Sequence, residues 1–316
     1  MHWRIKGLIQ KTLALVPAGD KLHYQLQRQL GGLRNFDREL DIKVDDWAIM
    51  TTHLRNFGLE FEGARLMEIG TGWYPTFPLA CHLAGASTVS TFDLQRHLRT
   101  DLTTHCIAAL ARHLERIAVT SGANLADVQA RWRALRDNWH RTGDLVAASQ
   151  GGIQYHAPAD ASQTGLPDGS VDLVFSNSVL EHVTPEVIEP IYREAHRLLA
   201  ADGLMFHSVN CGDHYAYVDG NINQLHYLRY SDAQWHFWNN DFLYQNRLRA
   251  HHFVEVANAC DFEILLNTAS ASPLRMEQLG RIDLAPEFTS IDAEKLCITS
   301  VDFIARKSAV LSQAAA

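Results

Sequence analysis

The chain has 316 residues, of which 47% are apolar and 20% charged, and its formal net charge is −8. This composition is typical of a globular protein with one large domain plus additions, or with two small domains. An acidic surface repels polyanions, so DNA or RNA is excluded as the main partner.

The cysteine pattern favours a reducing compartment. An odd number of widely spaced cysteines without a CxxC pair does not build a disulfide framework. Cys211 and His214 form a single C-x-x-H pair with no second pair nearby, so we expect no metal site. The five cysteines are Cys81, Cys106, Cys211, Cys260 and Cys297.

The N-terminal segment MHWRIKGLIQKTLALVPAGD contains two lysines, an arginine and a short, interrupted apolar run. It is not typical of a signal peptide or of a spanning helix. No apolar stretch elsewhere reaches the length that a membrane span needs. We therefore expect a cytoplasmic protein without a membrane span.

Residues 1–60 predict a helical N-terminal cap. Within it, apolar side chains recur at spacings of three and four, which places them on one face of a helix. These side chains are Trp47, Met50, Leu54 and Phe57.

From residue 61 onward, short apolar runs alternate with helical patterns. Strands that alternate with helices predict an α/β fold with a mostly parallel sheet and helices on both faces. Helices are expected at 76–86 and 184–203. The expected strands are 64–70, 87–94, 152–157, 171–177, 203–210, 262–270 and 296–306.

We expect one α/β domain over residues 61–316. Two segments within it are additions that a minimal fold of this kind does not need. Segment 97–150 is rich in Arg, Ala, Leu and Trp and predicts a helical insertion. Segment 212–250 is dense in Tyr, His, Trp and Asn and follows the fifth expected strand. Ligands bind beyond the carboxyl ends of strands in such sheets, so we interpret 212–250 as a substrate lid.

The loop after the first strand reads MEIGTGWYP and contains Gly70 and Gly72. Glycines allow a ligand to approach the backbone closely. A dinucleotide loop needs a third glycine, so that a pyrophosphate reaches the helix N-terminus, but Trp-Tyr-Pro follows here. The pattern therefore predicts an adenosine-bearing ligand without a diphosphate.

Three acidic residues stand at the ends of expected strands. Asp93 ends the second strand, where a carboxylate can accept both ribose hydroxyls. Asp160 follows the third strand and can accept the exocyclic amine of adenine. Glu68 ends the first strand and can hold an ammonium, directly or through water.

Four motifs, in order, resemble those of class I S-adenosylmethionine-dependent methyltransferases, in particular the broad type-11 group. They are MEIGTGW, FDL, PADASQTGLPDGSVDLVFSNSVLEHV and EAHRLLAADGLMFHSV, and the resemblance covers about residues 62–211. It implies a Rossmann-like, seven-stranded sheet with an antiparallel last strand, and S-adenosyl-L-methionine as cofactor. Tyr74 replaces the usual third glycine.

The resemblance also implies a set of cofactor residues. The methionine half would lie against the glycine loop, and Trp73 would either shield the sulfonium or belong to the core. Segment 212–250 resembles a subgroup that we associate with bacterial polysaccharide and secondary-metabolite gene clusters. The implied cofactor residues are Glu68, Gly70, Gly72 and Trp73, Asp93 at the ribose, Asp160 and Ala161 at the adenine, and Ser176 and Asn177 near the methyl group.

Methyl transfer is an in-line displacement that depends on alignment, and a hydroxyl or ammonium acceptor also needs a base. His214 is the candidate base, with Asp213 beside it as the residue that orients it. The alternative is that Asp213 caps the next turn and His214 only packs. His182 follows the fourth strand, where a side chain can face the methyl group.

Segment 212–250 also supplies the candidate substrate residues. Its aromatic side chains either form a lid or fill a small helical subdomain. Arg247 and Arg249 are two positions apart on an expected helix, so they cannot both face an acidic substrate. The candidate substrate residues are Tyr215, Tyr227, Arg229, Trp235, Asn246 and Arg247.

The resulting hypothesis is a methyltransferase that acts on oxygen or nitrogen of a small molecule. We favour an oxygen on a sugar or secondary metabolite, because SNSVLEH replaces the NPPY-type loop of amino-group methylation. One alternative is a non-catalytic cofactor-binding partner in a biosynthetic complex. Another is a nicotinamide-dependent oxidoreductase, against which the missing third glycine argues. A monomer and a homodimer both remain open.

Overall fold

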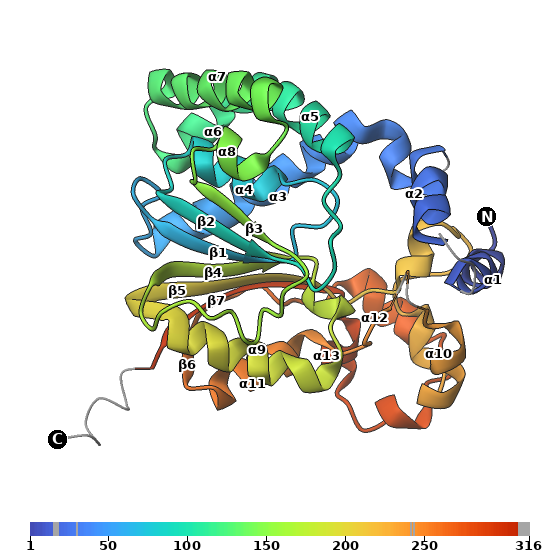
Figure 1. Ribbon diagram of the computed structural model, residues 1–316. Helices are drawn as coiled ribbons and strands as arrows, with labels where there is room; N and C mark the ends of the chain where they lie inside the picture. The colour runs from blue at the N-terminus through green and yellow to red at the C-terminus, as the bar shows by residue number, and fades with distance from the viewer. Residues whose placement is uncertain (15–18, 30, 241, 243, 309–316) are drawn as a thin grey trace.

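The computed structural model describes residues 1–14, 19–29, 31–240, 242 and 244–308. Its centre is a seven-stranded sheet with the order β3-β2-β1-β4-β5-β7-β6 (Figure 1). The first five of these strands pair in parallel, whereas β7 is antiparallel to both β5 and β6. The predicted fold class is therefore confirmed. The strands are β1 (Arg65–Ile69), β2 (Thr88–Phe92), β3 (Ile153–His156), β4 (Val171–Asn177), β5 (Leu199–Asn210), β6 (Phe262–Asn267) and β7 (Ser300–Lys307).

The last two strands are shorter than the sequence predicts, and the fifth is longer. Residues 296 and 297 belong to a short helix rather than to β7, and β6 ends at Asn267. The expected helix 184–203 ends at Leu198, because the backbone becomes extended at Leu199 and continues as β5. These differences lie at element ends, where local propensity decides least.

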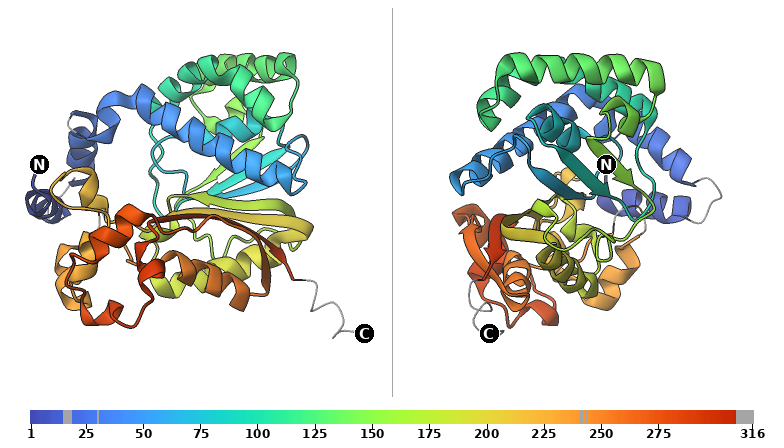
Figure 2. Two further views of the ribbon diagram at one scale, coloured as in Figure 1. Left: turned by 180° about the vertical axis from the view of Figure 1, so that it is seen from behind. Right: turned by 60° about the vertical axis from the view of Figure 1, so that its left-hand side comes forward.

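Helices cover both faces of the sheet, with α3 to α8 on one face and α9 and α11 on the other (Figures 1 and 2). The α-helices are α1 (Trp3–Ala14), α2 (Gly19–Gln29), α3 (Phe36–Asn56), α4 (Thr76–Leu83), α5 (Thr100–Ala109), α6 (Leu114–Ser121), α7 (Leu125–Thr142), α8 (Leu145–Ala148), α9 (Pro185–Leu198), α10 (Asp232–Trp238), α11 (Ala250–Ala259), α12 (Pro273–Leu279) and α13 (Ala293–Cys297). The 3-10 helices are η1 (Gly32–Asn35), η2 (Leu110–His113), η3 (Leu180–His182), η4 (His214–Tyr217), η5 (His226–Arg229) and η6 (Pro286–Phe288).

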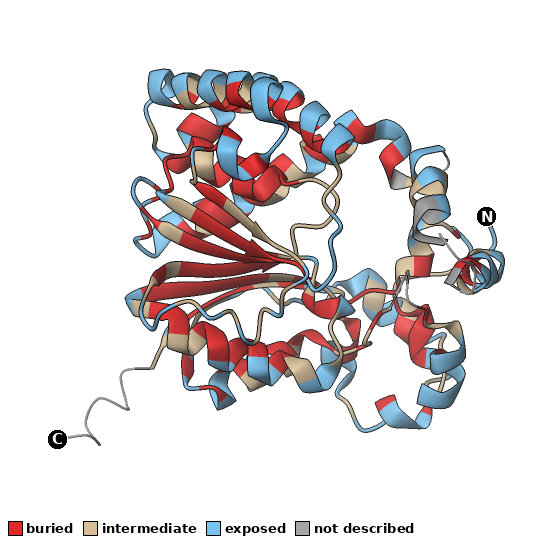
Figure 3. Ribbon diagram, in the orientation of Figure 1, coloured by how far each residue is buried: buried red, intermediate tan, exposed pale blue. Residues whose placement is uncertain are grey.

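Successive residues of the central strands enter opposite cores. Leu173 and Phe175 of β4 pack with α3 to α8, and Val174 packs with α9 and α11. This alternation follows from the two-residue period of a strand. Successive strand residues are apolar on both faces because helices cover both faces of the parallel part of the sheet. The strands accordingly form the buried centre of the molecule (Figure 3).

Helix α3 carries the predicted apolar stripe. Trp47, Met50 and Leu54 are buried in the same core as the sheet. Phe57 is not part of the stripe, because α3 ends at Asn56 and the Phe57 side chain is exposed. Of the N-terminal helices, α3 therefore lies on the sheet, whereas α1 and α2 lie beyond its edge (Figure 2).

Segment 97–150 is helical, and both of its tryptophans donate hydrogen bonds to helix α5. Trp132 Nε1 donates to Ile107 O at 2.9 Å, and Trp139 Nε1 donates to Thr104 Oγ1 at 2.9 Å. Both acceptors belong to α5, which lies in the same segment, so these bonds join two helices of the insertion, while Trp139 is also buried in the core that contains the sheet.

Segment 212–250 forms a third core with α1 and the chain before β7. This core joins Trp3 of α1, Tyr227 of η5 and Leu296 of α13. No helix in the described ranges is long and apolar enough to span a membrane.

Arg249 holds this third core to the sheet domain. Its side chain is 0% exposed and precedes α11. Its guanidinium donates to Tyr227 Oη at 2.7 Å and to Leu296 O at 2.8 Å. It also donates to the carbonyl oxygens of Cys211 and Ile298. One side chain thus joins the end of β5, η5 and the chain that enters β7.

We expect Arg249→Met to lower the free energy of unfolding by about 2–5 kcal/mol, because buried carbonyl groups lose their donors. Urea denaturation followed by circular dichroism measures this change. Arg229→Met is the matched control, because Arg229 is exposed. Equal stability of the two variants would contradict the anchoring role of Arg249.

Candidate functional site

The parallel strands end on the side of the sheet where α1, α2 and α10 lie (Figure 1). Parallel pairing brings the carboxyl ends of β1, β2, β3, β4 and β5 to this one edge. The predicted site residues follow these strands. The edge is therefore the candidate site.

Glu68 lies in β1 and is 5% exposed. Its Oε2 accepts hydrogen bonds from Thr91 Oγ1 at 2.6 Å and Thr71 Oγ1 at 2.8 Å. Burial raises the pKa of the Glu68 carboxyl to about 7, and the two hydroxyls only partly oppose this. Both charge states of Glu68 are thus populated near neutral pH.

The two glycines of the loop after β1 differ in what a side chain at their position would contact. Both have positive φ, +81° at Gly70 and +72° at Gly72. A Cβ at Gly70 would lie 2.5 Å from Val179 Cγ2, so this position lets two loops pack. A Cβ at Gly72 would meet nothing within 4 Å, so Gly72 borders open space that a ligand can enter. Trp73 is partly buried against the core and its ring meets Tyr24 edge-on at 5.9 Å.

Asp93 follows β2 and is held against the glycine loop. Its Oδ2 accepts the N–H of Gly72 at 3.2 Å and the hydroxyl of Tyr155 at 2.8 Å. Burial raises the pKa of the Asp93 carboxyl. The next residue, Leu94, is apolar and 73% exposed, and no motif in the sequence indicates its place here.

The loop after β3 lies beside Asp93, because Ala159 N donates to Asp93 O at 2.9 Å. In this loop Asp160 is exposed, and its Oδ1 accepts from Ser162 N at 2.8 Å and Ser162 Oγ at 2.7 Å. Ala161 is partly buried against the core. The structure thus brings the two predicted adenosine acids to neighbouring loops.

Ser176 and Asn177 end β4 in different surroundings. Ser176 is fully buried, and its Oγ lies 2.7 Å from His207 Nδ1 inside the sheet. Ser176 therefore does not reach the site surface. The resemblance implies, in contrast, that it lies near the methyl group of the cofactor. Asn177 Oδ1 accepts from Lys43 Nζ at 3.0 Å. Lys43 comes from α3, and no motif in the sequence indicates its place here.

Three side chains meet where β4 and β5 end: Glu181 and His182 of η3, and His214 of η4. The rings of His182 and His214 are 5.0 Å apart between centroids. Burial raises the pKa of Glu181 to about 8 and lowers the pKa of His214 to about 3. His182 has an exposed edge, and burial of the rest of its ring lowers its pKa. We call these three residues the Glu-His-His cluster.

Asp213 does not contact the His214 ring. It is fully buried, its Oδ1 accepts Tyr215 N at 2.8 Å, and its Oδ2 lies 2.9 Å from His226 Nδ1. Asp213 therefore caps η4 and orients His226. This arrangement matches the alternative in which Asp213 caps the next turn.

Residues 244–246 connect to all three members of the cluster. His182 Nδ1 donates to the Tyr244 carbonyl at 2.6 Å, and His214 N donates to Gln245 Oε1 at 3.2 Å. Asn246 N donates to the Glu181 carbonyl at 2.9 Å. The Asn246 amide also donates to Leu180 O and Val183 O, so this predicted substrate residue binds the main chain of η3. We call residues 244–246 the clamp.

The other predicted substrate residues are mostly internal. Tyr215, Tyr227 and Trp235 are buried in the third core, as in the alternative of a small helical subdomain. Arg247 is buried too and donates to Tyr227 O at 3.0 Å and to Asp232. Arg229 is exposed.

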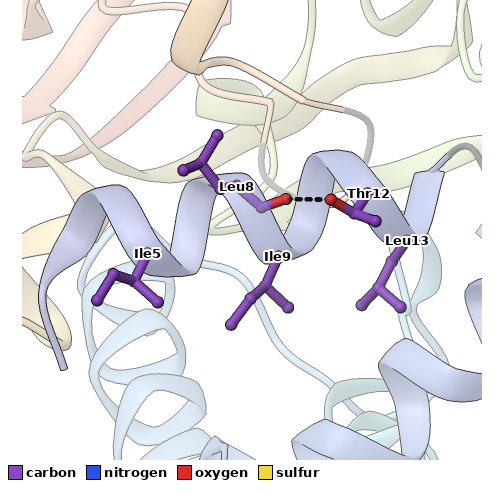
Figure 4. A pocket seen from close by; sticks show the side chains of 5 residues that line it. All are labelled: Ile5, Leu8, Ile9, Thr12 and Leu13. Carbon is purple, nitrogen blue, oxygen red and sulfur yellow. Dashed lines mark hydrogen bonds between the residues drawn. The ribbon is translucent and has the colours of Figure 1, made fainter.

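A separate apolar hollow lies on α1 (Figure 4). Its lining contains no titratable side chain, so it lacks the groups that acid–base chemistry needs. The residues that line it are Ile5, Leu8, Ile9, Thr12 and Leu13.

The raised pKa of Glu68 predicts a pH dependence of stability. Between about 4.5 and 7 the folded state binds a proton that the unfolded state has released, so this group makes stability fall as pH rises. Glu68→Gln removes the titration and retains an acceptor for both threonines. From pH 5 to pH 8 we expect urea denaturation to show the variant gaining about 2–3 kcal/mol relative to wild type. Parallel pH profiles would contradict the raised pKa.

Comparison with known proteins yields one family match. The model of a methyltransferase domain matches residues 108–207, from within α5 to within β5, and so does not include the glycine loop. A search of curated protein sequences finds no match.

Several solved structures are similar at low identity. One is an S-adenosylmethionine-dependent methyltransferase from Mesorhizobium loti, with 16% identity, a TM-score of 0.41, and coverage of 81% of this chain and 96% of that one. Another is geranyl diphosphate C-methyltransferase from Streptomyces coelicolor in complex with S-adenosyl-L-homocysteine, with 13% identity, a TM-score of 0.45, and coverage of 86% and 84%.

The sheet, with β7 as the antiparallel strand, has the arrangement that the resemblance to class I methyltransferases implies. These findings do not support the nicotinamide alternative or a non-catalytic role. Residues 108–207 thus match a methyltransferase domain, and S-adenosyl-L-methionine is accordingly the cofactor.

Proposed function

We propose that the enzyme methylates an oxygen atom of a small molecule, held between the cofactor and the Glu-His-His cluster. The observation that carries this proposal is the position of the cluster. It occupies the ends of β4 and β5, at the same sheet edge as Glu68 and Asp93. Buried groups that accept hydrogen bonds favour an acceptor that carries a hydroxyl group.

The residues at the ends of β1, β2 and β3 suit the cofactor. Asp93 would accept the ribose hydroxyls, Leu94 would pack on the adenine, and Asp160 Oδ2 would accept the adenine amine. Gly72 borders the open space that the methionine half would enter. S-adenosyl-L-methionine supplies a methyl group that its sulfonium makes electrophilic.

Lys43 and Glu68 would bind the charged ends of the methionine moiety. The charge of Lys43 contributes to lowering the pKa of Glu68, and the Lys43 ammonium lies at the end of β4. A cation beside an acid complements an amino acid, whose carboxylate and ammonium carry opposite charges. Asn177 would orient Lys43 through their 3.0 Å hydrogen bond.

We further propose that segment 212–250 forms the acceptor side of the site. It contributes His214 and the clamp. Segment 97–150 packs on the sheet domain and would support the cofactor loops from outside. The formal net charge of −8 over the whole chain does not favour a nucleic acid as the acceptor.

Asp93→Asn should weaken binding of S-adenosyl-L-methionine by about 1–3 kcal/mol, because a neutral amide accepts hydrogen bonds from the ribose less strongly. Calorimetric titration measures this loss. Tyr155→Phe is the control, since it removes one partner of Asp93 and keeps the acid. Unchanged affinity of the Asp93 variant would remove this residue from the site.

The acceptor class is tested by turnover on a panel of sugars, phenols, hydroxy acids and amines. Mass spectrometry detects S-adenosyl-L-homocysteine and the methylated product. We expect methyl ethers from hydroxyl compounds. Methylamines as the only products would contradict an oxygen acceptor while leaving the methyltransferase assignment intact.

A further inference from the structure

We propose that Glu181, His182 and His214 bind a divalent transition-metal ion. Each residue offers one ligand atom, and these three atoms lie within 4.8 Å of one another. Two imidazoles and one carboxylate form a ligand set that such ions use in proteins.

Glu181 supplies the strongest structural argument. Its side chain is 1% exposed, and both carboxyl oxygens are buried without a hydrogen-bond partner. The main-chain amides of Glu181 and Asn210 lie nearby, outside normal hydrogen-bond geometry. Buried polar groups nearly always have partners, and a carboxyl group without one is costly. A bound cation would supply the missing partner.

The two histidines present free nitrogen atoms. His182 Nδ1 donates to the Tyr244 carbonyl at 2.6 Å, which leaves Nε2 with its lone pair. A hydrogen bond from the other ring nitrogen to a carbonyl is the usual way in which metal-binding histidines are oriented. His214 Nε2 is buried and also has no partner.

The geometry needs only a modest adjustment. Zinc-type bonds of about 2.0–2.2 Å place ligand atoms roughly 3.3–3.6 Å apart in a tetrahedral site. The ligand atoms, which lie within 4.8 Å of one another, would therefore have to move closer together on binding. Imidazole ligands favour Zn²⁺, Co²⁺ or Ni²⁺ over Mg²⁺ and Ca²⁺, which prefer oxygen.

Lys43 is the competing cation. Its ammonium influences the charge of Glu181, but its hydrogen bond at 3.0 Å is to Asn177. Within the described ranges, Lys43 forms no ion pair with Glu181. Lys43 therefore does not bind the two carboxyl oxygens of Glu181, and these oxygens remain available to a metal ion.

Three protein ligands leave an open coordination position, and this step rests on the proposed function. The acceptor's hydroxyl oxygen would take that position, where the metal lowers its pKa and its proton leaves to solvent. The oxygen lone pair then forms a bond to the methyl carbon while the carbon–sulfur electrons stay on sulfur. The products are a methyl ether and S-adenosyl-L-homocysteine, and the metal keeps its charge. The acceptor class is a hydroxyl compound that can ligate a metal.

Titration of the chelator-treated protein with Co²⁺ tests the site, by calorimetry and by visible absorption. We expect one ion per chain with a Kd in the micromolar range or below, and ligand-field bands in the visible. His182→Gln, His214→Gln and Glu181→Gln should each weaken binding at least about tenfold. His236→Gln is the matched control, because His236 is an exposed histidine of α10.

Absence of saturable Co²⁺ binding would overturn the proposal. So would binding that survives His182→Gln and is lost in His251→Gln, since His251 and His252 are another adjacent histidine pair. Circular dichroism verifies folding, and His182, with its exposed edge, is the variant least prone to misfold. Calorimetry with S-adenosyl-L-methionine on the metal-free protein separates the two proposals: cofactor binding without Co²⁺ binding removes the metal alone, and Co²⁺ binding without cofactor binding removes the proposed function.

Discussion

The clamp at residues 244–246 is the constraint on which the proposed acceptor site depends. Three consecutive residues each hold one member of the cluster: Tyr244 holds the His182 ring, Gln245 the main chain of His214, and Asn246 the main chain of Glu181. The cluster residues follow two neighbouring strands, and the clamp adds a link from elsewhere in the chain to the loops after both of them. The clamp thereby ties segment 212–250 to the ends of β4 and β5.

A second constraint places the clamp itself. Arg249 lies three residues beyond Asn246 and binds carbonyl groups from β5's end and from the chain before β7. Its burial among neutral acceptors makes the local arrangement specific, since few other positions could satisfy the guanidinium. The aromatic side chains of the segment then fill the third core around it. These aromatic side chains pack in the core, so the polar groups at the site come from Glu181, His182 and His214.

Local patterns predict the sheet and the cofactor loops well. The strands carry apolar runs, and Glu68, Gly72 and Asp93 stand directly at strand ends, so short motifs suffice to locate them. Contacts between distant segments are not visible in such motifs. Lys43 reaches the site from α3, and Asp213 pairs with His226 instead of His214. Glu181 stands next to His182 in the motif, but only the folded chain shows that its carboxyl group is buried.

The cluster forms the acceptor side of the proposed methyl-transfer site. A crystal structure of the protein with S-adenosyl-L-homocysteine tests this claim most directly. We predict that the ribose lies on Asp93 and that the sulfur faces the open side of His182 and His214. A cofactor bound at Asp93 with its sulfur directed away from the cluster would contradict the account.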